Sequence, residues 1–210
     1  MKSMVTALLV LLIVPALAAA TCYDLLLDHG TMSFDYQQVG GGINGNFVSV
    51  GGLAGTPPSQ GTIAVTFPLD GLNYLLVLGA VEDGVEFRDA GVILVSSVAP
   101  ITPGVYSLDG TNAVFLQIDD AMGWNPPTDP CAVNWSIELA SIVAAGKYGS
   151  ISGTLDLTSL DMGGASGTFD AVVEDPDTGI QLDVTNGQFN VVPPSPVEDV
   201  SFGSVKALYR

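Results

Sequence analysis

Basic residues are scarce in this chain. Only 5 Lys and Arg stand against 22 Asp and Glu in 210 residues, which gives a formal net charge of −17. A nucleic-acid groove needs clustered basic side chains to neutralise phosphates, and docking on anionic lipid needs them too. The composition therefore predicts that nucleic acid is not a partner, and it argues against binding to an anionic membrane surface.

Histidine and cysteine are also rare, with 1 His and 2 Cys. These are too few for a zinc site built from several His and Cys ligands, or for covalent haem attachment. Ser-His-Asp catalysis would have to use His29, and no serine lies in a G-x-S-x-G sequence. We expect His29 to be a surface residue at a turn, because Gly30 follows it.

Long hydrophobic runs are confined to the N-terminus. Lys2 gives a positive start, Val5–Val14 is almost wholly apolar, and Ala18–Ala20 offers small residues for cleavage. The apolar run is short of the roughly 20 residues that a transmembrane helix needs. The pattern is typical of a secretory signal peptide over 1–20. We expect a secreted or outer-envelope protein with no transmembrane span after cleavage.

The two cysteines leave two possibilities for the mature N-terminus. Cys22 lies near the expected cleavage site, where a lipidated cysteine would stand, but Thr21 replaces the small residue that usually precedes one. In an oxidising compartment, a disulfide between Cys22 and Cys131 is the alternative, and we favour it. Closing so long a loop would contribute about 4–5 kcal/mol on the chain-entropy model.

Turn dipeptides divide the body of the chain. Each allows the positive φ angles of a two-residue hairpin, and apolar residues alternate with polar ones on either side. About ten or eleven short strands fit residues 21–192. We predict an all-β fold, a single antiparallel β-sandwich of the jelly-roll or immunoglobulin-like kind, with a closed β-barrel as the alternative. The dipeptides are Asn44-Gly45, Asp70-Gly71, Asp83-Gly84, Asp109-Gly110 and Asn186-Gly187.

One segment is compatible with either a helix or a strand. Within Val133–Ala145, the apolar residues Trp135, Ile137 and Leu139 alternate with polar ones. A period of two residues is typical of a strand. We therefore predict a strand here, with Glu138 on its solvated face.

The C-terminal part of the domain resembles a known group of proteins. The quoted segments are Gly149–Thr158 (GSISGTLDLT), Ser166–Phe169 (SGTF) and Val184–Phe189 (VTNGQF), with Gly104–Tyr106 (GVY) earlier in the chain. They resemble the closing strands of a family of uncharacterised bacterial secreted proteins and lipoproteins, which pair a G-x-L-x-I-T strand with G-T-F and V-T-N-G-x-F strands. The resemblance implies a β-sandwich at the cell envelope, and it supplies no catalytic residues.

Acidic loops make calcium the candidate cofactor. Oxygen-rich loops suit this hard cation, although neither loop matches an EF-hand, and solvated turn acids are the alternative. The first candidate loop holds Glu174, Asp175 and Asp177, and the second holds Asp119, Asp120 and Asp129.

The second loop belongs to the longest irregular stretch, Asp119–Cys131, which also holds Trp124. Trp124 could bind a ligand by stacking on a sugar or peptide ring, or it could cover the core. After Val192, residues 193–199 form a proline-rich linker and 200–210 a tail that we expect to be dispensable for folding.

The sequence as a whole predicts a non-enzymatic binding or surface-structural module, stabilised by calcium if by any cofactor. Its expected partner is an extracellular protein or a carbohydrate. The alternative is a secreted glycosidase-like hydrolase that uses paired carboxylates in an acidic cleft. Converging buried carboxylates in a concave site would distinguish the enzyme from the binding module.

Overall fold

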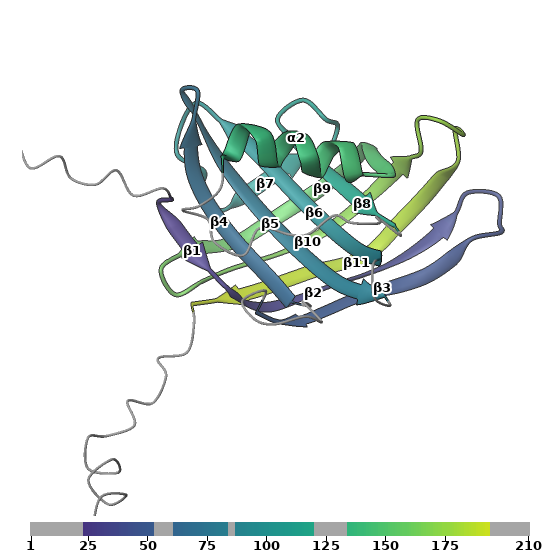
Figure 1. The fold of residues 1–210 in the computed structure, drawn as a ribbon, viewed down its shortest axis with the longest axis horizontal. Coiled ribbons are helices and arrows are strands. Elements are labelled where there is room, and N and C mark those ends of the chain that lie inside the picture. The colour runs from purple at the N-terminus through teal and green to yellow at the C-terminus, as the bar shows by residue number, and fades with distance from the viewer. Residues whose placement is uncertain (1–22, 53–60, 84–86, 120–133, 194–210) are drawn as a thin grey trace, which may run out of the picture.

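The computed structural model describes residues 23–52, 61–83, 87–119 and 134–193, and it shows eleven strands and one helix there (Figure 1). The strands are β1 (Leu25–Leu27), β2 (His29–Gln38), β3 (Asn44–Gly51), β4 (Gly61–Leu69), β5 (Leu72–Asp83), β6 (Phe87–Ser97), β7 (Gly104–Ser107), β8 (Ala113–Ile118), β9 (Tyr148–Asp161), β10 (Gly164–Glu174) and β11 (Gln181–Val192), and the helix is α2 (Trp135–Ala145). The prediction of an all-β domain is confirmed.

All the strands belong to one antiparallel sheet. Its order is β1-β4-β5-β6-β8-β9-β10-β11-β2-β3, and β7 also pairs with β9. The sheet curls into a half-barrel, so that β2 and β3 pack against β4 and β5 (Figure 1). One curled sheet is a different arrangement from two facing sheets, and the predicted sandwich is therefore not confirmed.

The connection between β1 and β2 requires the curl. β1 is the first strand of the order and β2 the last but one, yet Asp28 is the single residue between them. One residue spans less than 4 Å of chain. The two sides of the sheet must therefore meet at Asp28.

The inside of the curl is filled with apolar side chains. Phe34, Phe115 and Phe169 meet at its centre, where the ring of Phe115 lies 5.2 Å from that of Phe34 and 5.0 Å from that of Phe169. All three are buried, and Leu, Val and Met side chains from β1, β2, β5 and β11 surround them. This inner face is the main hydrophobic core.

A second core lies on the outer side of β4, β5, β6 and β8, beneath α2 (Figure 1). These strands are buried on both faces, which explains their nearly continuous apolar sequences. Trp135 of α2 stacks on Phe67 of β4, with ring centroids 4.0 Å apart. The helix therefore shields a sheet face that would otherwise expose large apolar side chains.

The predicted strand over Val133–Ala145 is wrong, because most of this segment forms α2. Asn134 caps the helix, and its Oδ1 accepts hydrogen bonds from the backbone N of Ser136 and Ile137 at 3.2 and 3.4 Å. The side chains turned toward the sheet follow the three-to-four-residue spacing of a helix. These side chains are Trp135, Glu138, Leu139 and Ile142. Ile137, by contrast, is 67% exposed.

The turn predictions had mixed outcomes. Asp70-Gly71 joins β4 to β5 as predicted, with φ of 51° and 82°. Asn44-Gly45 instead begins β3, after a turn that contains Gly40 and Gly41. Asp109-Gly110 links β7 to β8, which both lie along β9 and do not pair with each other.

The predicted Asn186-Gly187 hairpin is wrong. Both residues lie inside β11, which runs unbroken from Gln181 to Val192. Asn186 has φ of 55° at an irregularity where the pairing of β11 with β2 shifts register. A side chain at Gly187 would collide with the carbonyl oxygen of Phe169, so glycine serves close strand approach here. Of Asp83-Gly84, only Asp83 is described, as the last residue of β5.

In the part of the chain that the structure describes, no helix has the length and apolar character needed to span a membrane.

Candidate functional site

Polar side chains replace apolar ones at one end of the inner face. This end carries the β2–β3 and β10–β11 hairpins, which project on the right of Figure 1. We call the group the inner polar cluster. It consists of Tyr36 from β2, Asp89 from β6, Gln117 from β8, Asp119 after β8, Lys147 before β9 and Tyr148 at the start of β9.

Strand alternation brings these residues together. On β8, Ala113 and Phe115 belong to the inner core, and Gln117 follows two residues later on the same face. Gln117 pairs directly with Tyr148, which is also part of the inner core. The cluster is therefore a continuation of the core toward solvent.

Asp89 comes to the same face from β6. Ile93 and Val95 of that strand lie in the inner core, and Asp89 is placed an even number of residues before them. Its partner across the ladder, Val81, also packs against the inner core. Gly91 lies between Asp89 and Ile93 on β6. It pairs with Gln117 on β8 and has no side chain that would cover the amide.

Gln117 is the most unusual member of the cluster. The residue is only 6% exposed, and its Oε1 is buried with no hydrogen-bond partner among the residues that the structure describes. Leaving a buried acceptor unpaired costs about 1–3 kcal/mol. An apolar residue at this position would avoid that cost, so the amide needs an explanation other than core packing.

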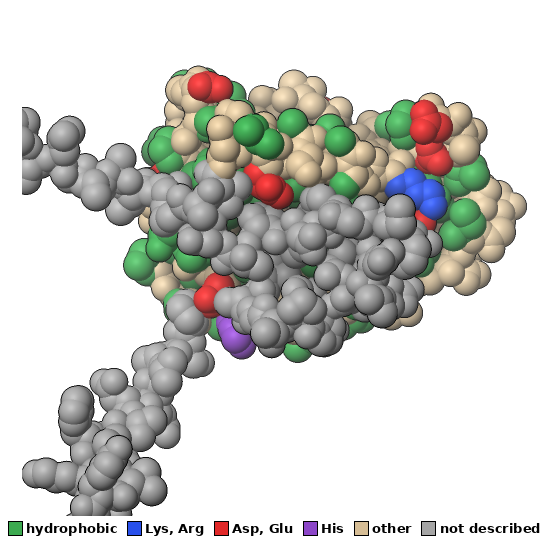
Figure 2. All heavy atoms as spheres, viewed as in Figure 1, with side chains coloured by type: hydrophobic (Ala, Val, Ile, Leu, Met, Phe, Trp, Pro, Cys, Tyr) green, Lys and Arg blue, Asp and Glu red, His purple; other side chains and the backbone are tan. Residues whose placement is uncertain are grey.

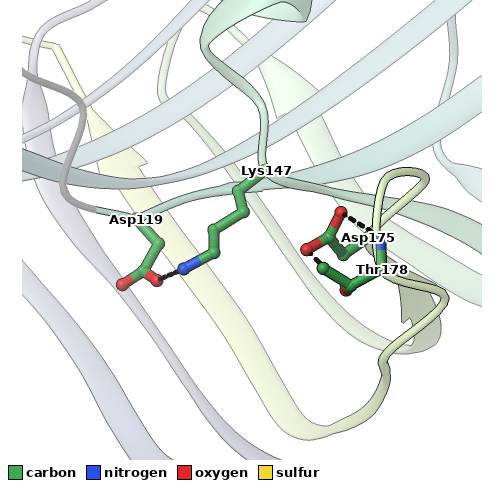
Figure 3. A network of polar contacts seen from close by, with 4 residues as sticks. All are labelled: Asp119, Lys147, Asp175 and Thr178. Carbon is green, nitrogen blue, oxygen red and sulfur yellow. Dashed lines mark hydrogen bonds and ion pairs between the residues drawn. The ribbon is translucent and has the colours of Figure 1, made fainter.

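Lys147 gives the cluster its positive charge. Its Nζ donates a hydrogen bond to Oδ2 of Asp119 (Figure 3). The same atom lies 5.5 Å from the centre of the Tyr148 ring. Both side chains of the ion pair remain partly exposed. In the view of Figure 2, basic side chains appear at one place on the described surface, beside acidic ones. The ion pair joins the segment before β9 to the end of β8.

Tyr36 keeps its proton at neutral pH. Burial raises the pKa of its hydroxyl, and the negative charges of Asp119 and Asp89 raise the pKa further, while Lys147 lowers it. The Tyr36 ring lies over Gly45 of the neighbouring strand, where a methyl group would collide with the hydroxyl. Glycine at position 45 therefore leaves room for the Tyr36 ring to lie along the sheet. The protonated hydroxyl of Tyr36 can act as a hydrogen-bond donor.

In the first predicted calcium loop, the carboxylates of Asp175 and Glu174 accept hydrogen bonds from the protein, and Asp177 is exposed. Asp175 Oδ1 accepts from the backbone N of Asp177 at 2.9 Å, and Oδ2 accepts from Thr178 Oγ1 at 2.8 Å (Figure 3). These hydrogen bonds hold the pKa of Asp175 below its usual value. Oε2 of Glu174 accepts from Nε2 of Gln181 at 2.7 Å across the β10–β11 pair.

The second predicted calcium loop is only partly described. Asp119 pairs with Lys147, and Asp120 and Asp129 lie outside the described residues. Within residues 23–52, 61–83, 87–119 and 134–193, no three Asp, Glu, His or Cys side chains lie close enough to hold a metal ion.

Other predicted site residues fall elsewhere. Trp124, Cys22 and Cys131 lie outside the described residues, so the ligand-stacking role and the disulfide stay predictions. His29 begins β2 with its side chain largely exposed. Its position at the surface is as expected, but it stands in a strand and not in a turn.

A small cavity lies at the other end of the half-barrel. It has a volume of about 250 Å³ and combines apolar walls with two aspartates, Asp24 and Asp161. Asp161 Oδ1 accepts from the backbone N of Gly163 at 2.6 Å. The remaining lining residues are Leu25, Thr66, Asn73, Tyr74, Pro100, Ile101, Leu160 and Met162.

Sequence reasoning named Asp119 and missed the other five members of the inner polar cluster. A signal for Gln117 was present, because this residue interrupts the apolar sequence Ala113–Ile118. A polar residue in a strand buried on both faces is expected to have a specific partner. Tyr36 and Tyr148 had no such signal, because their strands are more than a hundred residues apart in the chain.

The chain matches no family model, no curated protein and no solved structure.

Proposed function

We propose that this protein is a non-enzymatic binding module of the extracellular space or cell envelope, which holds a small polar ligand at the inner polar cluster. The observation that carries the proposal is the buried, unpaired Oε1 of Gln117. A ligand that donates a hydrogen bond to this atom would remove the cost of its burial.

The position of the cluster supports a binding role. The inner face is packed with aromatic and aliphatic side chains up to Phe115, and the polar groups begin beyond it. The open end of a curled or closed sheet is a common place for a ligand. Gln117 and Tyr148 are buried, and Tyr36, Asp119 and Lys147 beside them are partly or fully exposed to solvent.

The proposed location rests on residues 1–20, whose charged start, apolar run and small residues are typical of an exported protein. Lipid attachment at Cys22 remains the alternative to free secretion. For the detailed fold, the one-residue connection at Asp28 favours the closed arrangement over the sandwich, because it ties both sides of the sheet together.

A thermal-shift screen tests the binding role. Wild-type protein is melted with sugars, amino acids, amines and carboxylates at millimolar concentration, and any hit is titrated by calorimetry. We expect at least one hit, because a ligand that binds only the folded state raises the melting temperature. The Gln117→Met variant should lose this hit, whereas Gln37→Met, at an exposed glutamine on the outer side of β2, should keep it.

The same variants test whether Gln117 serves a ligand or the fold. Without ligand, Gln117→Met should be more stable than wild type by about 1 kcal/mol or more, because it removes the unpaired acceptor. A screen without hits, or a Gln117→Met variant that is less stable and binds as well as wild type, would contradict the proposed function.

One observation favours the hydrolase as a second candidate. Asp24 and Asp161 line the same cavity, as a pair of carboxylates for glycoside hydrolysis would. If this cavity is catalytic, the protein hydrolyses nitrophenyl glycosides and Asp24→Asn and Asp161→Asn each abolish the activity. Asp156→Asn, on the exposed side of β9, is the control. Equal release of nitrophenol by all three variants would exclude this candidate site.

A further inference from the structure

We infer that the cavity lined by Asp24 and Asp161 binds a small organic amine, a cation that carries a short apolar body. The cavity shares no residue with the inner polar cluster, so this inference goes beyond the proposed function and does not depend on it. It follows from the charge of the lining, from the exposure of its polar and apolar residues, and from the size of the cavity.

The polar part of the lining is acidic. Asp24 and Asp161 contribute two carboxylates, and no Lys, Arg or His is among the described residues around the cavity. Nδ2 of Asn73 already donates to the carbonyl oxygens of Ser97 and Val98, at 3.4 and 3.1 Å, so the amide has only its oxygen left for a ligand. These groups attract a cation that donates hydrogen bonds, and they repel a carboxylate or phosphate.

The two carboxylates have oxygens that the protein does not use. Oδ1 of Asp161 accepts from the backbone N of Gly163, which leaves Oδ2. Among the described residues, none donates a hydrogen bond to the carboxylate of Asp24 or forms an ion pair with it. An ammonium group can therefore bond to both side chains without breaking a contact within the fold, and hydrogen bonds between charged groups are the strong ones.

The carboxylates are closer to solvent than the deepest apolar residues of the lining. Asp24 and Asp161 are exposed, whereas Leu25 is buried and Ile101 and Leu160 are half-buried. An amine can place its apolar body against these side chains and keep its ammonium partly hydrated beside the carboxylates. This arrangement avoids the cost of burying a charge away from water.

Tyr74 adds an aromatic surface to the cavity. Its ring stacks on Phe67, with centroids 5.5 Å apart, so the opposite face and the edge of the ring are what it can offer to a ligand. The face of an aromatic ring attracts cations and also packs against apolar groups. Both parts of an amine are therefore matched by the lining.

The size of the cavity sets the size of the amine. Its volume is about 250 Å³. An apolar cavity of about 150 Å³ holds one benzene ring, so there is room here for a ring and a two-carbon arm that ends in an ammonium. A lysine side chain of another protein carries the same charged group, but its thin stem would leave much of this space unfilled. We therefore choose a free amine, and phenethylamine is the probe.

The test is calorimetric titration of the protein with phenethylamine. 2-Phenylethanol and 3-phenylpropionate carry a neutral and an anionic group on the same phenylethyl body, and a short peptide with one lysine presents the ammonium on a polypeptide. We expect phenethylamine to bind more tightly than all three. Asp24→Asn and Asp161→Asn should each weaken its binding about tenfold, because asparagine keeps the shape and loses the charge. Asp156→Asn, on the exposed side of β9, should bind phenethylamine with unchanged affinity.

Each alternative has its own outcome. If 2-phenylethanol binds as tightly as phenethylamine, charge does not select the ligand and the inference is overturned. If only the lysine peptide binds, the occupant is a protein partner and the free amine is wrong. If phenethylamine binding is lost in Gln117→Met and kept in Asp24→Asn, the amine lies at the inner polar cluster, so the proposed function stands and this inference fails. If phenethylamine does not bind at all, this inference alone is overturned, because other compounds test the proposed function.

Discussion

Trp135 and Phe67 stack face to face, with ring planes inclined by only 11°. One residue opens α2 and the other lies near the end of β4, so their contact fixes the helix on the outer side of the sheet. The face beneath α2 would otherwise expose Ile63, Val65 and Leu76 to water. The helix is therefore a structural cover for one part of the curled sheet.

Trp135→Ala should lower the free energy of unfolding by about 3–5 kcal/mol, because it removes a large buried aromatic side chain and leaves a cavity. Ile137→Ala is the matched control on the exposed side of the same helix, and it should change stability by less than about 1 kcal/mol. Urea unfolding followed by circular dichroism measures both. Equal effects of the two variants would show that α2 does not pack as described.

Glu138 should destabilise the fold at neutral pH. Burial beneath the helix raises the pKa of its carboxyl above the ordinary 4.5, so the folded state disfavours the charged form. The protonated carboxyl favours the folded state relative to the charged one. This contribution to stability is present below the unfolded pKa and is lost as pH rises through the folded pKa. Glu138→Gln should therefore have a higher melting temperature than wild type at pH 7. The gain in free energy of unfolding should be less than about 1 kcal/mol, because the side chain is partly exposed.

The difference between Glu138→Gln and wild type should disappear below about pH 4, where the carboxyl is protonated in both states. Thermal melts between pH 3 and pH 8 measure this. A gap that persists unchanged at pH 3 would show that the charge of Glu138 is not its cause.

Asp175 should have the opposite pH dependence. Hydrogen bonds from Thr178 and from the backbone N of Asp177 lower the pKa of Asp175, so the folded state favours the charged form. Stability is gained above the unfolded pKa and lost as pH falls through the folded pKa. Asp175→Asn should lower the melting temperature at pH 7 and approach wild type in acid.

Thr178→Val tests the cause of the Asp175 effect. It removes the hydroxyl that donates to Oδ2 and should show a smaller loss with the same pH dependence. A loss that is constant from pH 3 to pH 8 in both variants would mean that turn geometry, and not the carboxylate charge, is what the substitutions disturb.

Calcium should raise the melting temperature modestly at millimolar concentration. The reason is the excess of 22 acids over 5 bases, because a bound cation reduces repulsion in acid-rich loops. Asp175 and Glu174 already accept hydrogen bonds within the protein and Asp119 is paired with Lys147, so we expect Asp120 and Asp129 to matter most. Magnesium and sodium chloride at matched ionic strength are the controls, and an equal shift with all three salts would leave only screening.

The all-β class was predictable because turn dipeptides and alternating apolar residues act locally. The helix was not, because Trp135, Ile137 and Leu139 suggest a period of two while the burial follows Trp135, Leu139 and Ile142. Asn134 before the segment and Gly146 after it were the better signals, since both are common at helix ends. The register shift in β11 depends on pairing with β2, about 150 residues away in the chain, and no local pattern reveals it.

The candidate site was predictable only in part. Asp119 stood out as an acid in a loop, but its partner Lys147 comes from the far side of α2 in the chain. Gln117 becomes informative once the strand is known to be buried on both faces, which depends on α2 and on the curl. The cluster is a product of tertiary structure, because its members come from β2, β6, β8 and β9.

The single residue between β1 and β2 has a consequence for how the chain folds during synthesis. β2 pairs with β3 nearby, but its other neighbour is β11, where Thr31 lies opposite Asn190. β1, joined to β2 through Asp28, pairs with β4. The sheet therefore runs without a break from β4 to β2 only when β11 has paired with β2. Contacts between residues so far apart slow folding. The half-barrel is therefore completed last, after the end of β11 has been made.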